Sequence, residues 1–197
     1  GGDGADELFG GYTNYSRILK SASMTRYMPQ VVGNAISSLS ATLLPQGFRG
    51  RNWLKALSSD LNTSLPLVAL LFDANYRERL LLGSNIDISG ECAEEVWRLR
   101  IPKSKGLLDR TTRMDFKNYL PEDILVKIDR ASMMNSLELR APFLNADIIE
   151  FAFSRVPERL KANNNQRKII LKILAEKLFP KGFNMQRKQG FSIPLAH

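Results

Sequence analysis

Three carboxylates stand among glycines in the opening twelve residues, Gly1-Gly2-Asp3-Gly4-Ala5-Asp6-Glu7-Leu8-Phe9-Gly10-Gly11-Tyr12. Carboxylate oxygens are the hard ligands that hold Mg²⁺ against substrate phosphates, and Asp6 and Glu7 also suit the positive end of a helix. Gly2 and Gly4 lack a Cβ, so the main chain can approach a ligand closely there. The spacing indicates a cation and phosphate site, although a glycine-rich turn before a capped helix explains the same residues.

Several other kinds of site are excluded. The opening is not an EF-hand, because the twelfth residue counted from Asp3 is Asn14 and not a glutamate. The only histidine is His197, so the chain itself supplies no Ser-His or Cys-His catalysis and no histidine zinc site. The only cysteine, Cys92, excludes an internal disulfide framework and favours a reducing compartment. We therefore expect a cytoplasmic protein.

The composition is that of a globular protein, with 44% hydrophobic and 24% charged residues. No apolar run approaches the 18 residues of a membrane span, so no membrane association is expected. The net charge of +8 is concentrated between Arg155 and Lys188, where ten basic residues face two acidic ones. Such a segment favours an anionic partner, which could be nucleic acid, an acidic surface or a nucleotide phosphate.

Helical periodicity dominates the sequence and alternating β-branched runs are missing, which predicts a mainly α chain. Asp109 is expected to N-cap one helix, and Pro121 to occupy the first turn of the next. The expected helices cover residues 8–28, 31–44, 51–61, 66–82, 91–99, 109–120, 121–135, 146–153 and 166–178. Residues 20–105 contain no cluster of reactive side chains and are interpreted as helical packing.

The most specific motif covers residues 119–144, Tyr-Leu-Pro-Glu-Asp-Ile-Leu-Val-Lys-Ile-Asp-Arg-Ala-Ser-Met-Met-Asn-Ser-Leu-Glu-Leu-Arg-Ala-Pro-Phe-Leu. It closely resembles the pattern Leu-Pro-Asp-x-Leu-Leu-x-Lys-x-Asp-Arg-x-Ser-Met...Glu-x-Arg-x-Pro-Phe-Leu-Asp of glutamine-dependent asparagine synthetases. The opening resembles their Gly-Asp-Gly-x-Asp-Glu-Leu-Phe-Gly-Gly-Tyr segment, and residues 187–191 resemble their late Arg-x-Lys-x-x-Phe loop. Because the three motifs occur in family order, the resemblance covers nearly the whole chain, with residues 20–105 contributing least.

The resemblance implies a fold and a domain plan. The chain would be the helical C-terminal portion of an adenine-nucleotide-α-hydrolase-like α/β synthetase domain. Its parts would be the site motif at 1–19, a helical packing region at 20–105 and a helical region with the later motifs at 106–197. The parallel sheet, the Ser-Gly-Gly-x-Asp-Ser phosphate loop and any glutaminase region would lie upstream. We expect this polypeptide alone to have little or no synthetase activity.

The resemblance also implies a reaction, in which ATP adenylates the β-carboxylate of aspartate and pyrophosphate leaves. Ammonia from glutamine then gives asparagine and AMP, with ATP and Mg²⁺ required. Asp6 falls on the family position associated with Mg²⁺ and pyrophosphate, and Asp3 on one that lines the acyl-adenylate. Lys188 falls on the lysine that contacts phosphate oxygens and the intermediate, so Lys188 is expected to meet Asp6. The further expected binding residues are Gly2, Gly4, Glu7 and Arg130.

Some features weaken or widen this interpretation. For Arg130 and Arg140, a structural ion pair with Asp129 or Glu138 is favoured over a substrate contact. Gly1 and Asn145 stand where the family commonly has Ser and Asp. Relatives with this domain activate other carboxylates, so aspartate is not fixed as the substrate.

Two other functions stay open. One is a basic helical nucleic-acid-binding module, although no reader motif is recognisable. The other is a helical interaction domain without chemistry. A homodimer is compatible with the sequence.

Overall fold

The structure is a computed structural model and describes residues 1–43, 93–102 and 106–180, together with Leu54, Leu61, Leu65 and Leu80. Within these residues it is helical and has no β-strand, only an isolated antiparallel bridge between Ala162 and Arg167. The predicted mainly α class is confirmed for this part, while the helices expected at 51–61 and 66–82 lie outside it. None of the described helices is long and apolar enough to cross a membrane.

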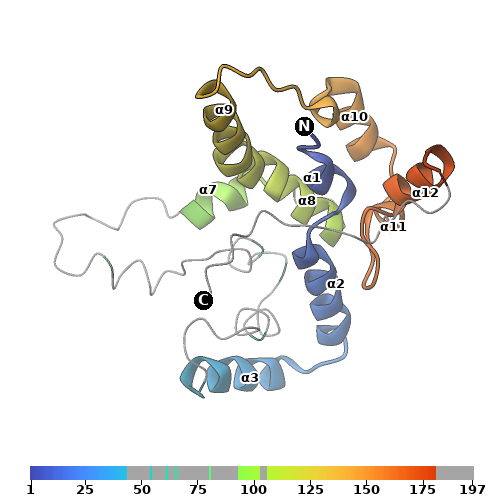
Figure 1. The fold of residues 1–197 in the computed structure, drawn as a ribbon. Helices are drawn as coiled ribbons and strands as arrows, with labels where there is room; N and C mark the ends of the chain where they lie inside the picture. Colours follow the sequence, from blue (N-terminus) through green and yellow to red (C-terminus); the bar gives the residue numbers. More distant parts are fainter. Residues whose placement is uncertain are drawn as a thin grey trace, which may run out of the picture.

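Figure 1 shows how the described helices are arranged along the chain. Their bounds are α1 (Ala5–Phe9), α2 (Thr13–Thr25), α3 (Gln30–Leu43), α7 (Ala93–Leu99), α8 (Leu107–Lys117), the π-helix η1 (Leu120–Leu125), α9 (Val126–Met133), the 3-10 helix η2 (Pro142–Leu144), α10 (Ala146–Ser154), α11 (Glu158–Lys161) and α12 (Ile169–Leu178).

Residues 8–28 are mostly helical, as expected, but they do not form one continuous helix, because the chain turns sharply after Phe9. Helix α1 ends at Phe9, and Gly10 takes the left-handed conformation with φ 70°. The Gly11 N–H then donates to the Asp6 carbonyl at 2.8 Å. A left-handed glycine after the last helical residue is a common way to end a helix, because glycine has no Cβ to clash there. Helix α2 starts afresh at Thr13.

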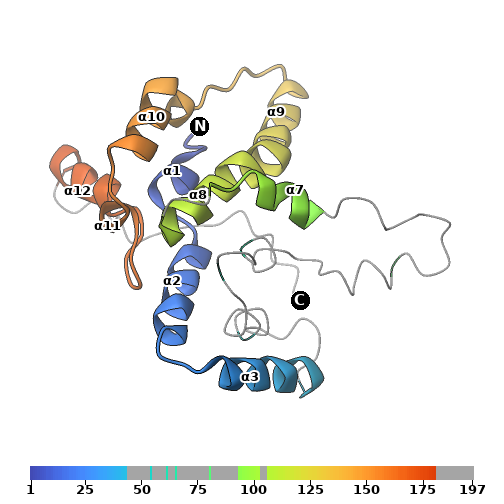
Figure 2. The same ribbon diagram turned by 180° about the vertical axis from the view of Figure 1, so that it is seen from behind.

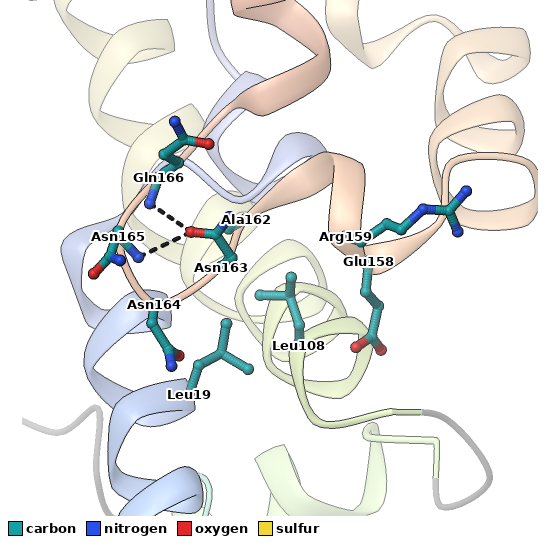
Figure 3. Close-up of a pocket in the computed structure, with 9 residues that line it drawn as sticks. All are labelled: Leu19, Leu108, Glu158, Arg159, Ala162, Asn163, Asn164, Asn165 and Gln166. Carbon is teal, nitrogen blue, oxygen red and sulfur yellow. Dashed lines mark hydrogen bonds between the residues drawn. The ribbon is translucent and has the colours of Figure 1, made fainter.

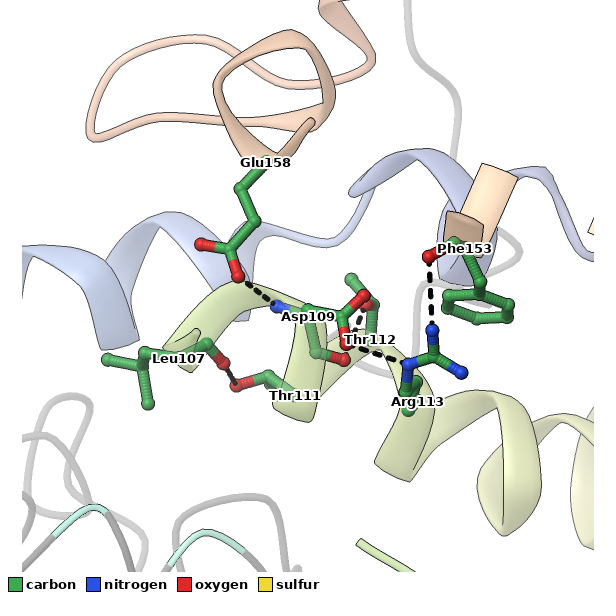
Figure 4. Close-up of polar contacts among 7 residues, drawn as sticks. All are labelled: Leu107, Asp109, Thr111, Thr112, Arg113, Phe153 and Glu158. Carbon is green, nitrogen blue, oxygen red and sulfur yellow. Dashed lines mark hydrogen bonds and ion pairs between the residues drawn. The ribbon is translucent and has the colours of Figure 1, made fainter. Parts of the chain in front are cut away.

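Helix α8 begins earlier than expected, and Asp109 is not its N-cap. The N-cap is Gly106, and Asp109 lies in the first turn. Figure 4 shows that the Asp109 N–H donates to the Glu158 carboxylate at 3.0 Å, while the Arg113 Nε lies 2.7 Å from the Asp109 carboxylate. Arg113 also donates to the Phe153 carbonyl at 3.1 Å. The distant Glu158 carboxylate thus accepts from a free N–H at the start of α8 and links this helix to α11, while Arg113 links it to α10.

Helix α1 lies at the centre of the described fold, next to α8 and α10 in both views (Figures 1 and 2). Its Leu8 and Phe9 are buried against Ala152 and Val156. The removal of such apolar side chains from water contributes roughly 1.5–3 kcal/mol for each large one. The short site helix is therefore held by its neighbours and not by its own helical propensity.

Candidate functional site

The Asp6 carboxylate, from the first turn of the central helix α1, forms an ion pair with the Lys168 ammonium. Their Oδ1 and Nζ atoms lie 3.0 Å apart, and the two side chains are 25% and 30% exposed. Lys168 directly precedes α12 and has φ 52°, a left-handed conformation that a non-glycine residue rarely adopts. Such strained residues cluster at functional sites, where the surrounding contacts hold them in place.

The sequence did not single out Lys168, which was assigned to a helix expected over 166–178. The helix begins only at Ile169. A lysine that ends an Asn-rich loop just before an apolar helix was the available signal. Its partner is 162 residues away (168 − 6), and no local pattern reports a contact of that range.

Gly11 lies in direct contact with this ion pair. A Cβ on Gly11 would lie 1.7 Å from the Asp6 Oδ1 and 2.3 Å from the Lys168 Cε. The Gly11 carbonyl accepts a hydrogen bond from the Arg167 Nη1 at 3.3 Å. A larger residue at position 11 would therefore push the Asp6 and Lys168 side chains out of their present positions.

The opening motif also packs on the Pro142-Phe143-Leu144 turn of the second motif. Gly4 has φ 86°, and a Cβ there would lie 2.3 Å from the Leu144 Cδ2. The Gly1 nitrogen donates to the Arg140 carbonyl at 2.6 Å. Two motifs that the resemblance placed far apart in the chain therefore meet around α1.

The other expected site residues fall in different surroundings. Gly2 has open space around its Cα, since no atom lies within 4 Å of an added Cβ. Asp3 is partly buried at the start of the motif. Arg130 is exposed on α9. Arg140 pairs with Glu138 on the surface, which confirms the structural ion pair expected for it. Lys188 lies outside the described residues, so its expected meeting with Asp6 stays a prediction.

Glu7 faces the interior, unlike its neighbour Asp6. Only 1% of its surface is exposed, and its carboxylate accepts a hydrogen bond from the Tyr12 hydroxyl at 2.5 Å. Burial raises the pKa of Glu7, because it disfavours the charged form, and the Tyr12 hydroxyl partly opposes this shift. In this arrangement Glu7 is not accessible to a dissolved ligand.

A second buried carboxylate, Asp115, lies on α8 and interacts electrostatically with Glu7. Burial raises the pKa of Asp115 to about 7, the Tyr15 hydroxyl lowers it and the Glu7 charge raises it. The Tyr15 hydroxyl is itself buried and makes no hydrogen bond of standard geometry to a described residue. Glu7, Asp115 and Tyr15 thus form a buried group of interacting polar side chains from α1, α8 and α2.

A shallow pocket of about 660 Å³ lies between α2, α8 and the loop before α12 (Figure 3). Leu19 and Leu108 form its apolar wall. On the polar wall, the Asn163 Oδ1 accepts from the Asn165 and Gln166 N–H groups at 2.9 and 2.7 Å. These polar groups serve the loop's own turn, and the pocket lining does not include Asp6 or Lys168.

The described residues can contribute to a cation site without forming a complete one. No three His, Cys, Asp or Glu side chains gather in this part of the chain. Asp6 offers one partly exposed carboxylate beside a positive charge. This fits Mg²⁺, which keeps several waters and is usually bound by one or two carboxylates together with substrate phosphates.

Comparisons with known proteins give a consistent result. The asparagine synthase family pattern matches residues 1–197. The chain is 31% identical over 198 aligned positions to asparagine synthetase [glutamine-hydrolyzing] 1 of Bacillus subtilis (strain 168), covering 100% of the chain and 30% of that relative. It is 33% identical to a putative asparagine synthetase [glutamine-hydrolyzing] of Mycobacterium bovis, covering 29% of it. The chain thus spans about 30% of the length of the curated relatives it matches. No solved structure matches.

Proposed function

Because the chain belongs to the asparagine synthase family, we propose that the full-length protein is an ATP-dependent ligase that adenylates a carboxylate and converts it to an amide. Aspartate is the proposed acceptor and glutamine, hydrolysed to glutamate, is the proposed source of ammonia, so the products are asparagine, glutamate, AMP and pyrophosphate. The observation that carries the proposal is the Asp6–Lys168 ion pair, a carboxylate and an ammonium that lie together against Gly11.

The proposed reaction balances in two steps. A carboxylate oxygen of the acceptor attacks the α-phosphorus of ATP, and the bond from that phosphorus to the pyrophosphate oxygen breaks. Ammonia then attacks the activated carbonyl carbon, loses a proton, and the bond to the AMP oxygen breaks. Negative charge collects on phosphate oxygens in the first step, so positive groups held in place near them lower its barrier.

Each residue is given a role that its surroundings allow. Asp6 would bind Mg²⁺ at the pyrophosphate, and Lys168 would exchange its contact with Asp6 for the phosphate oxygens. Lys168 suits this role because a lysine is a compact charge on a flexible stem. Lys188 would contact the α-phosphate side, and Asp3 would line the adenylate. Mg²⁺, when bound, neutralises charge on phosphate oxygens and orients the leaving group.

The remaining roles belong to the backbone and to regions beyond this chain. Gly2 is the open position of the motif and would let the main chain approach the nucleotide. Arg130 would be a more distant phosphate contact. We further propose that an upstream phosphate loop and a glutaminase region of the same protein complete the site and supply ammonia, since the matched relatives are about three times longer than this chain.

Product analysis of the full-length protein tests the reaction. With Mg-ATP, ammonium and aspartate, we expect AMP, pyrophosphate and asparagine in equal amounts, with none formed when aspartate is omitted. Glutamate and other carboxylates in place of aspartate identify the acceptor. Formation of ADP and inorganic phosphate would instead show phosphorylation of the acceptor and would contradict adenylation.

A further inference from the structure

Glu7 is a buried carboxylate that the proposed chemistry does not use. It lies on the same short helix as Asp6, but its side chain points inward and is 1% exposed. Burial of a charged group costs free energy unless hydrogen bonds compensate for the lost water. The Tyr12 hydroxyl, 2.5 Å away, supplies such a bond. The position of Tyr12, next to the Gly10-Gly11 turn, indicates a role for the buried Glu7–Tyr12 hydrogen bond.

Tyr12 immediately follows the glycine turn that supports the Asp6–Lys168 pair. Gly10 is left-handed, and the Gly11 N–H closes the turn on the Asp6 carbonyl at 2.8 Å. The ring of Tyr12 packs against Tyr15 and Tyr119, with centroid distances of 5.5 and 5.9 Å. The turn is therefore fixed at its start by Asp6 and at its end by Tyr12.

We propose that Glu7 is a positioning residue for Asp6 and not a ligand of the cation or the phosphates. Glu7 accepts a hydrogen bond from the Tyr12 hydroxyl, and this bond holds the neighbouring Gly11 in position. The position of Gly11 in turn limits where the Asp6 carboxylate can lie. Gly11 can act on Asp6 in this way because the two are in direct contact: a Cβ added to Gly11 would lie 1.7 Å from the Asp6 Oδ1. The proposal rests on the proposed function, in which Asp6 binds the metal.

The two possible roles of Glu7 predict opposite results for two conservative variants. Glu7→Gln keeps an oxygen that can accept a hydrogen bond from the Tyr12 hydroxyl, but it removes the negative charge that a metal ligand needs. Tyr12→Phe removes the hydroxyl but leaves the Glu7 carboxylate in place. A positioning role therefore tolerates Glu7→Gln and is sensitive to Tyr12→Phe, whereas a ligand role gives the reverse.

The test is a titration of the full-length protein with Mn²⁺ in the presence of ATP, followed by electron paramagnetic resonance of free Mn²⁺. We expect Tyr12→Phe to weaken Mn²⁺ binding about tenfold, as is typical when a supporting hydrogen bond of a metal site is lost. Glu7→Gln is expected to keep the wild-type affinity. Loss of affinity in Glu7→Gln, or unchanged affinity in Tyr12→Phe, overturns the proposal.

Matched variants separate this result from general damage. Tyr27→Phe and Glu150→Gln change an exposed phenol and an exposed carboxylate and should leave Mn²⁺ affinity unchanged. Thermal unfolding of each variant reports stability. Should Tyr12→Phe unfold the protein, Glu7→Asp shortens the acceptor while keeping the charge, and it is expected to lose affinity. Retained affinity in Glu7→Asp would overturn the proposal.

Asp6→Asn distinguishes failure of the positioning role from failure of the proposed function. If Asp6→Asn binds Mn²⁺ like the wild type, Asp6 is not a metal ligand, and the proposed site itself is wrong. If Asp6→Asn loses Mn²⁺ while Tyr12→Phe retains it, the site stands and only the positioning role of Glu7 is rejected.

Discussion

Lys161 is the most unusual single residue of the described fold. Its side chain is fully buried, and its ammonium has no hydrogen-bond partner among the described residues. The Nζ lies 4.7 Å from the centroid of the Phe153 ring, and the Arg113 guanidinium lies 4.2 Å from the same centroid. Burial lowers the pKa of Lys161 to about 8, although the Asp109 and Glu158 charges raise it. The lysine therefore costs stability near neutral pH.

We predict that Lys161→Met stabilises the full-length protein, by roughly 1–3 kcal/mol at pH 7, because the apolar isostere needs no hydration. The unfolded chain binds more protons than the folded one between about pH 8 and pH 10.5, the two pKa values of Lys161. Wild-type stability therefore rises with pH in this window. Urea unfolding should show the largest gain below pH 8 and almost none near pH 10.5. An equal gain at every pH would contradict the assignment.

Asp115 provides the opposite pH dependence. Its pKa is raised from 3.8 to about 7, so the folded chain binds more protons than the unfolded chain between these values. The contribution of Asp115 to stability therefore falls as pH rises from 4 to 7. We predict that Asp115→Asn stabilises the protein by roughly 1–3 kcal/mol at pH 8, with the gain vanishing near pH 4. Urea unfolding of both proteins at the two pH values measures this difference.

At the scale of the element, the turn between α1 and α2 determines whether the site can form. Gly11→Ala would place a Cβ on the Asp6 oxygen and the Lys168 stem. We predict that this substitution lowers amide synthesis at least about tenfold, since small displacements of a binding group have effects of this order. Steady-state assay of the full-length protein, with its unfolding midpoint recorded in parallel, provides the measurement.

Gly106→Ala is the matched control for the turn. Its Cβ would also meet a carboxylate, that of Glu158, which caps the start of α8. We expect Gly106→Ala to lower stability by about 1 kcal/mol, as for the loss of a helix cap, and to leave activity intact. If the two alanine variants lose activity to the same extent, the specific role of Gly11 is contradicted.

The same elements show how far the sequence determines the structure. Apolar periodicity correctly predicts α3, α10 and the mainly helical class, because apolar residues recur at helical spacing in both segments. Helix α10 buries its apolar face against the core, whereas most of the large apolar side chains of α3 are exposed. It fails at Gly10-Gly11, where a left-handed C-cap interrupts a helical pattern. It also misplaces the start of α8, whose cap is Glu158 from a distant part of the chain. Local patterns do not report caps that tertiary contacts supply.

In the candidate site too, local patterns identify some residues, while others depend on tertiary contacts. The opening motif identifies Asp6 as a residue for chemistry, because its carboxylate stands among glycines in a motif that resembles a known family. The sequence suggests that Glu7 is a second binding residue, whereas the fold places it in the interior with Tyr12. It gives no indication that Lys168 is the partner of Asp6, since that pairing exists only after α1 and α12 come together.

At the scale of the whole molecule, three distant segments of the chain meet around α1. The opening motif contacts the turn at 142–144 and the loop at 162–168. We propose that this meeting point is part of a site for pyrophosphate and Mg²⁺. The Asp6 carboxylate and the Lys168 ammonium at this point supply the negative and positive groups that such a site uses.

The most direct test is aspartate-dependent exchange of labelled pyrophosphate into ATP, which isolates adenylation from ammonia transfer, in the full-length protein. The test compares three site variants, Asp6→Asn, Lys168→Ala and Lys188→Ala, with two control variants. The controls are Asp147→Asn and Lys177→Ala, which change exposed residues of α10 and α12. We predict that each of the first three lowers exchange about a hundredfold, a typical loss for a group that stabilises transition-state charge, and that the last two retain it. Wild-type exchange in Asp6→Asn and Lys168→Ala would contradict the account.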